Sequence, residues 1–230
     1  MNRRSVFSIL LSLVLLLGMI VPASAAPLTG GWTVSTQAGS YLSGSQKKLF
    51  AKAVETMDGV NYTPVFLLAS QVTAGTNYAF FCKAVTVTAE PVTSWKIVIV
   101  SKDLQGNASV SKVNQFNFKK IKTRKSAYAS SGAPGSWTYN DKNVGSKGIP
   151  SAAKKAFKKA VKQYTGVSLT PLVLLGTQLV AGTNYKFLCR GAMASAGGTV
   201  CLYEVDIYQN LEGACEVTNC NIINLPKYLK

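Results

Sequence analysis

Hydrophobic and polar positions follow a pattern that predicts one helix followed by four strands. Over about 46–57 the apolar residues recur every three or four positions, which is the period of an amphipathic helix. Ahead of this segment, Trp32-Thr33-Val34 is typical of a short strand. Later segments are rich in β-branched and aromatic residues, and some of them alternate with a period of two. The four strands predicted there cover about 62–71, 77–88, 94–101 and 108–117.

The same pattern occurs a second time in the chain. Gln71-Val72-Thr73-Ala74-Gly75-Thr76-Asn77-Tyr78 recurs as Gln178-Leu179-Val180-Ala181-Gly182-Thr183-Asn184-Tyr185, 107 residues further along. A period this long favours a duplicated domain over a solenoid. A small, polar stretch preceded by a run of lysines separates the copies and is typical of a linker. The predicted organisation is therefore repeat one at 30–118, a basic linker at 119–134 and repeat two at 135–230.

Each copy of the repeated stretch lies between two apolar, strand-like runs. Two such runs joined by a few residues containing glycine predict a β-hairpin. Gly75 and Gly182 are the residues that a tight turn with positive φ would require. We expect the residues before each glycine to lie at an exposed hairpin tip.

The second copy resembles a known family. Gln178-Leu179-Val180-Ala181-Gly182 is similar to the Gln-x-Val-x-Gly motif of the cystatins, which inhibit papain-like cysteine peptidases, and the following Thr-Asn-Tyr is also similar. In the first copy Thr73 replaces the valine of the motif. The resemblance implies an α+β fold with two tandem cystatin-like domains. Each would have a short first strand, one helix and a four-stranded antiparallel meander wrapped on the helix.

The resemblance also implies which residues contact a peptidase. Cystatins use an amino-terminal segment around a glycine, the motif hairpin, and the turn between the last two strands. Here the glycines would be Gly30 and Gly31 in repeat one and Gly135 in repeat two, and the turns would be 103–107 and 210–214. The Pro-Trp pair that often marks the second turn in the family is absent, and Leu104 and Leu211 are the nearest apolar substitutes. The implied peptidase-binding residues are Gln71, Val72, Thr73, Ala74, Gly75, Leu104, Gln105, Gly106, Gln178, Leu179, Val180, Ala181, Gly182, Leu211, Glu212 and Gly213.

The first 25 residues have the pattern of an export signal. Arg3 and Arg4 precede an apolar core at 6–20, and Ala23-Ser24-Ala25 is a small-residue cleavage site. We therefore expect a secreted, extracellular protein whose mature chain begins near Ala26. No later apolar run is long enough to predict a transmembrane segment.

The positive charge of the chain indicates a second kind of partner. The formal net charge is +16, of which Arg3 and Arg4 contribute two. Lysines cluster in the linker and on the polar side of the helix predicted in repeat two. An anionic cell-surface polymer is one partner that this charge would suit, and a role in solubility is the alternative. No recognition motif for nucleic acid is present.

The residue types argue against enzymatic activity. The chain has no histidine, so Cys-His and Ser-His catalytic pairs are excluded. We assign no catalytic residue, cofactor or metal ligand. Glu204 and Asp206 alternate on a predicted strand and are expected to form a solvated face. Cys82 and Cys189 are expected to be buried thiols, and a disulfide among Cys201, Cys215 and Cys220 stays open.

Two functions remain. The first is inhibition of papain-like cysteine peptidases, with repeat two as the active copy because it keeps the motif valine. The second is a non-inhibitory protein that binds another protein or a cell surface and reuses the same scaffold.

Overall fold

The computed structural model describes residues 30–37, 39–117, 135–140, 145, 147–193 and 200–230. The predicted signal peptide, 1–25, and the predicted linker, 119–134, lie outside these residues. Within them, every helix and strand of the first repeat has a counterpart in the second, in the same order. The two repeats therefore have the same order of elements.

Repeat one forms a five-stranded antiparallel sheet and one α-helix. The sheet has the order β1-β2-β3-β4-β5, so each strand pairs with its neighbour in sequence. The helix lies between the first two strands of the chain. The elements are β1 (Trp32–Val34), α2 (Gly44–Val54), β2 (Val60–Thr73), β3 (Gly75–Thr86), β4 (Thr93–Lys102) and β5 (Ala108–Gln115).

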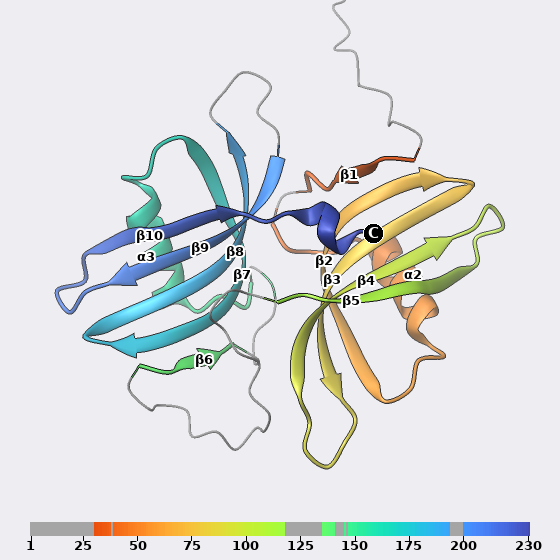
Figure 1. Ribbon diagram of the computed structural model, residues 1–230, viewed down its shortest axis with the longest axis horizontal. Coiled ribbons are helices and arrows are strands. Elements are labelled where there is room, and N and C mark those ends of the chain that lie inside the picture. The colour runs from red at the N-terminus through yellow and green to blue at the C-terminus, as the bar shows by residue number, and fades with distance from the viewer. Residues whose placement is uncertain (1–29, 38, 118–134, 141–144, 146, 194–199) are drawn as a thin grey trace, which may run out of the picture.

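Repeat two has the same topology and ends in a short 3₁₀ helix. Its sheet has the order β10-β9-β8-β7-β6. Figure 1 shows the sheet of repeat one on the right, that of repeat two on the left, and η1 between them. The elements are β6 (Trp137–Tyr139), α3 (Ser151–Val161), β7 (Val167–Val180), β8 (Gly182–Met193), β9 (Val200–Gln209), β10 (Cys215–Ile222) and η1 (Leu225–Tyr228).

The helix of repeat one begins with a reciprocal side-chain cap. The Ser43 backbone N–H donates to Gln46 Oε1 at 2.9 Å, and the Gln46 N–H donates to Ser43 Oγ at 3.2 Å. This reciprocal pair satisfies two backbone donors that the helix start would otherwise leave free. Helix α3 follows Pro150 and has no side-chain cap.

The predicted fold class is wrong. In place of an α+β fold with four-stranded meanders wrapped on helices, the described residues form ten strands in two five-stranded sheets and only two short α-helices. The fold is therefore mainly β. One reason is that the first strand of each repeat belongs to the sheet, since Trp32 pairs with Gln71 and Trp137 with Gln178.

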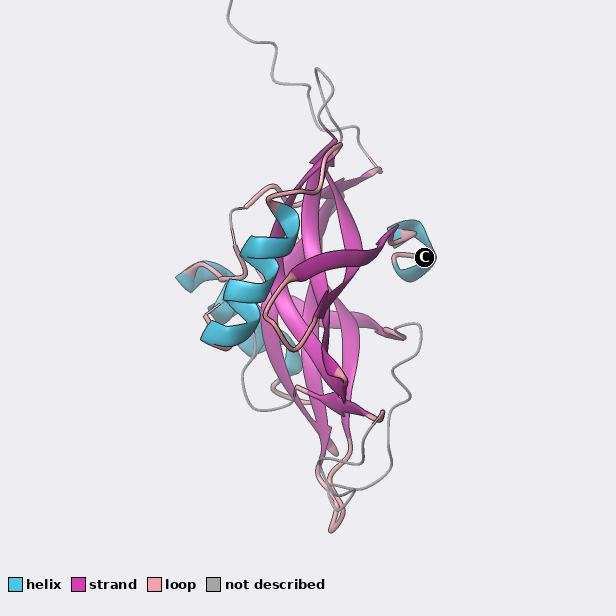
Figure 2. Cartoon of the chain, turned by 90° about the vertical axis from the view of Figure 1, so that its left-hand side faces the viewer, coloured by secondary structure: helices cyan, strands magenta, loops and turns pink. Residues whose placement is uncertain are grey.

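A second reason why the predicted fold class is wrong is that both faces of each sheet are buried. One face packs on the helix of the same repeat, where the rings of Phe50 and Phe80 lie 5.1 Å apart and those of Phe157 and Phe187 lie 5.0 Å apart. In Figure 2 both helices lie on one side of the strands and η1 on the other. A strand buried on both faces has a continuous apolar run, as in β7, where residues 172–176 are all buried.

The other faces of the two sheets contribute to one shared core. Its buried residues include Phe81 and Trp95 from repeat one, with Leu188 and Leu202 from repeat two. Buried residues of the carboxyl-terminal segment, such as Leu225, belong to the same core. Contacts between repeats also include the ring of Tyr228, 4.7 Å from that of Phe116. The Tyr228 carbonyl accepts a hydrogen bond from Asn114 Nδ2 at 2.7 Å.

All five cysteines are free thiols in the structure, so no disulfide is formed among Cys201, Cys215 and Cys220. Cys82 and Cys189 are fully buried on the helix-facing sides of their sheets, as predicted. Burial disfavours the thiolate and raises the pKa of both thiols well above the usual value. The other three are half-buried.

We predict that alkylation will separate these two groups. The thiolate is the reactive form, so iodoacetamide at mildly basic pH should modify Cys201, Cys215 and Cys220 in the folded chain but not Cys82 or Cys189. Peptide mass spectrometry would report the sites, and the same reaction in urea should modify all five. Rapid labelling of Cys82 in the folded chain would contradict the burial described here.

Candidate functional site

The predicted peptidase-binding segments of each repeat come together at one end of its sheet. In repeat one, Thr76 pairs with Lys102, so the β2–β3 hairpin lies beside the turn between β4 and β5. In repeat two, Thr183 pairs with Gln209 and brings the β7–β8 hairpin beside the β9–β10 turn. The two hairpin ends of repeat one line an open hollow of about 440 Å³.

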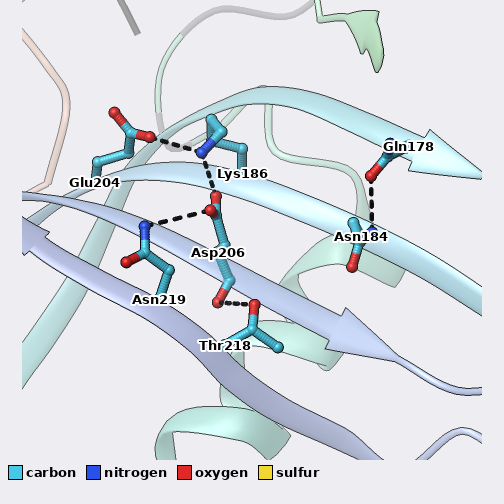
Figure 3. Close-up of polar contacts among 7 residues, drawn as sticks. All are labelled: Gln178, Asn184, Lys186, Glu204, Asp206, Thr218 and Asn219. Atoms are coloured by element: carbon cyan, nitrogen blue, oxygen red, sulfur yellow. Dashed lines mark hydrogen bonds and ion pairs between the residues drawn. The ribbon is translucent and has the colours of Figure 1, made fainter. Parts of the chain in front are cut away.

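The glutamine of each motif joins three segments of this end. Gln71 Nε2 donates to the Gly30 carbonyl at 2.9 Å, and Gln71 Oε1 accepts from Asn77 Nδ2 at 2.8 Å. Repeat two has the same arrangement, with Gln178 between Gly135 and Asn184 at 2.9 and 2.8 Å. The Gln178–Asn184 bond is drawn in Figure 3. Each glutamine amide is thus used within the chain, where it fixes the segment before the first strand against the hairpin.

The motif glycines are required by the close approach of a neighbouring strand. Gly182 has φ +122°, and a Cβ added there would lie 2.3 Å from the Gln209 carbonyl oxygen. Gly75, with φ +151°, would clash in the same way with the Lys102 carbonyl oxygen at 2.4 Å. Both positions therefore exclude a side chain, because the backbone of the next hairpin occupies the space.

Apolar side chains are exposed at these ends. Leu104 and Leu211 are 79% and 78% exposed, and Leu179 is 59% exposed. Val72 and Val180 are also exposed, so five of the nine exposed large apolar residues in the described part of the chain lie at these ends. The remaining candidates divide into exposed Thr73, Ala74, Gln105, Ala181 and Glu212, and less exposed Gln71, Gly75, Gly106, Gln178, Gly182 and Gly213.

The ends of the two repeats do not form one site. In Figure 1 the β2–β3 and β4–β5 connections lie at the right-hand side, and the β7–β8 and β9–β10 connections lie at the left. Each repeat therefore presents its own candidate surface. We call the surface of repeat two, formed by Gly135, residues 178–182 and residues 210–214, the repeat-two edge.

Two residues that the sequence analysis did not select hold the repeat-two edge in place. The Tyr208 hydroxyl donates to the Ala181 carbonyl at 2.5 Å, and Lys159 Nζ donates to the Gly213 carbonyl at 3.1 Å. The first bond ties β9 to the hairpin tip, and the second ties α3 to the second turn. Nothing in a single sequence places these donors beside their acceptors.

A buried ionic cluster in repeat two corrects another prediction. Glu204 and Asp206 were expected on a solvated face, yet Glu204 is 7% exposed and its Oε1 lies 2.6 Å from Nζ of fully buried Lys186. Asp206 is bonded to the same ammonium group, and Figure 3 shows the cluster. The Trp137 ring centroid lies 5.5 Å from this Nζ. The feature of the sequence that could have predicted this pairing is Lys186, on the strand next to the two carboxylates.

Comparisons with known proteins do not assign the chain to a family. No protein-family model matches the chain, and no curated protein is similar to it in sequence. None of the helices in the described residues has the length and apolar character to span a membrane. In the same residues no three Cys, Asp or Glu side chains are grouped as metal ligands would be.

We predict that removing only one member of the cluster will be strongly destabilising. Lys186→Met leaves two carboxylates without their cation, which costs about 3–5 kcal/mol of unfolding free energy for a buried pair. The equivalent positions of repeat one hold Ala79, Ile97 and Ile99. The triple change Lys186→Ala, Glu204→Ile and Asp206→Ile should therefore lie close to wild type in urea unfolding. A triple variant less stable than the single one would contradict this account.

We also predict that acid will loosen the second turn of repeat one but not that of repeat two. Hydrogen bonds from the Asn107 side chain and backbone lower the pKa of Asp103. A lowered pKa stabilises the turn above the unfolded-state value, near pH 4, and this contribution is lost as the pH falls through the folded-state value. Asn210 accepts the equivalent bond from the Ala214 N–H at 2.8 Å and does not titrate.

Amide chemical shifts measured by NMR between pH 6 and pH 2 would test this difference. The Asn107 amide should shift with the titration of Asp103, to which its N–H donates, whereas the Ala214 N–H donates to Asn210, so its acceptor does not change charge with pH. Asp103→Asn should remove the response at Asn107. A response that persists in this variant would assign it to another group.

Proposed function

We propose that the chain is a secreted inhibitor of papain-like cysteine peptidases and that the repeat-two edge enters the active-site cleft. The observation that carries the proposal is the convergence of three segments, two of which present exposed apolar residues. Leu179, Val180 and Leu211 are held at one end of the sheet without being buried by the chain itself. Exposed apolar groups clustered on a rigid scaffold are typical of binding surfaces.

The proposed mechanism is passive. The hairpin and the second turn fill the cleft with apolar side chains and main-chain hydrogen-bonding groups, and no residue of the chain performs a chemical step. Internal bonds of Gln178, Tyr208 and Lys159 hold the edge in one conformation before binding. A preordered edge loses less conformational entropy on binding than a flexible loop, which favours affinity.

The secreted location belongs to the same proposal. It is supported by the positive residues, the apolar core and the small-residue cleavage site of the first 25 residues. Papain-like peptidases outside the cell that exports the chain would then be the targets.

A second candidate is a non-inhibitory module that binds another protein through the same ends. The specific observation in its favour is that Gln178 and Gly182 are both explained by the architecture of the hairpin. The match of these two residues to the cystatin motif is therefore weaker support for binding to a peptidase. The exposed apolar residues fit either kind of partner.

We predict that inhibition depends on repeat two. The mature full-length chain, titrated against several papain-like peptidases, should inhibit stoichiometrically. The double variant Val180→Asp with Leu211→Asp should weaken inhibition strongly, because each residue would contribute about 2 kcal/mol if it is a central contact. The full chain is used because the two repeats share a core.

The matched control changes the equivalent residues of repeat one, Val72→Asp with Leu104→Asp. All four residues are exposed, so neither variant should alter the unfolding free energy much. The control variant should inhibit as well as wild type. A folded wild-type chain that inhibits none of the peptidases would contradict the proposal and favour the second candidate.

A further inference from the structure

The solvent side of helix α3 is strongly basic. Lys154, Lys155, Lys158, Lys159 and Lys162 are all exposed on α3 or at its carboxyl end. No acidic residue occurs between 147 and 166. In the described part of the chain, the ion pairs involve Lys186 and none of these lysines. None of these lysines is therefore held in an ion pair within those residues.

The lysines form rows along the helix. Lys154, Lys158 and Lys162 are four residues apart, so they follow one another by about 6 Å along the axis. Lys155 and Lys159 form a second row beside them. Like charges four residues apart disfavour a helix, and lysines close to its amino-terminal end oppose the helix dipole. Lys158, Lys159 and Lys162 suit the negative end of the dipole at the carboxyl end, so the dipole leaves only Lys154 and Lys155 unexplained.

Helix α2, in repeat one (Figure 1), carries a second group of exposed lysines. Its exposed residues include Lys47, Lys48 and Lys52. Both helices lie on the same side of the strands, as Figure 2 shows. We call the exposed lysines of α2 and α3 the basic face. It is distinct from the repeat-two edge, although Lys159 of the basic face bonds to Gly213 of that edge.

Most apolar residues of α3 face away from solvent. Ala153, Ala156, Phe157 and Ala160 are buried and pack in the core of repeat two. A helix that binds a lipid bilayer needs exposed apolar side chains to insert between the headgroups, and α3 has none of appreciable size. Its contacts are limited to charge, which favours an extended polyanion over a bilayer.

We propose that the basic face binds a linear polyanion with regularly repeated phosphate charges, such as an anionic polymer of a cell surface. Rows of ammonium groups pair with successive phosphates of such a chain and release its condensed counterions. Because the two basic helices lie on one side of the strands, a long polymer contacts both of them and a short oligomer contacts one. This binding does not depend on peptidase inhibition.

The test measures binding of the mature chain to long-chain polyphosphate, tripolyphosphate, and vesicles of phosphatidylglycerol and phosphatidylcholine. Wild type should bind long-chain polyphosphate more tightly than tripolyphosphate, with an affinity that falls steeply as salt rises. The variant Lys154→Gln, Lys158→Gln and Lys162→Gln should bind long-chain polyphosphate at least about tenfold more weakly, since three phosphate contacts are lost. Lys159 is left unchanged because it bonds to Gly213.

The matched control removes the same charge elsewhere, with Lys112→Gln, Lys227→Gln and Lys230→Gln. These lysines are exposed and lie outside both helices. The control should lose less than about threefold in affinity, because only the long-range attraction is reduced. Equal losses in the two variants, or binding to vesicles without binding to polyphosphate, would overturn the proposal. Thermal melting would show that both variants are folded.

Discussion

Burial of both faces of each sheet is the constraint on which the rest of the structure depends. A single small helix covers one face of each sheet, and the apolar residues of the other face would contact water in an isolated repeat. Phe81 and Trp95 of repeat one therefore share a core with Leu188 and Leu202 of repeat two. The carboxyl-terminal segment contributes Leu225 and Leu229 to this core. The consequence is that the two candidate surfaces are held at fixed positions at opposite ends of the molecule (Figure 1).

The sequence predicted the local structure better than the architecture. The predicted helix at about 46–57 and strands at about 62–71 and 94–101 correspond to α2, β2 and β4 within a few residues. Periodicity reports which residues face an apolar environment, and this is a local property. It does not report what supplies that environment. For this reason the resemblance led to a helix-wrapped α+β fold, whereas the structure is mainly β with a core shared by two sheets.

The candidate site shows the same division between local and long-range information. The exposed hairpin tips were predicted from Gly75, Gly182 and the flanking apolar runs, and the chain places them at the ends of β2 and β7. The internal use of Gln178 and the support from Tyr208 and Lys159 depend on distant segments. The same holds for Lys186, whose partners Glu204 and Asp206 lie on the neighbouring strand. In repeat two, hydrogen bonds from polar residues therefore hold in place the repeat-two edge, whose exposed side chains are apolar.

The measurement that tests the central claim most directly is hydrogen exchange of the mature chain with and without a papain-like peptidase. A second sample would contain the same peptidase with its active-site cleft blocked covalently. The account predicts slower exchange at residues 179–182 and 211–214 with the free peptidase, and no such change with the blocked one. Protection confined to other parts of the chain, or protection that persists with a blocked cleft, would contradict the claim that the repeat-two edge enters the active site.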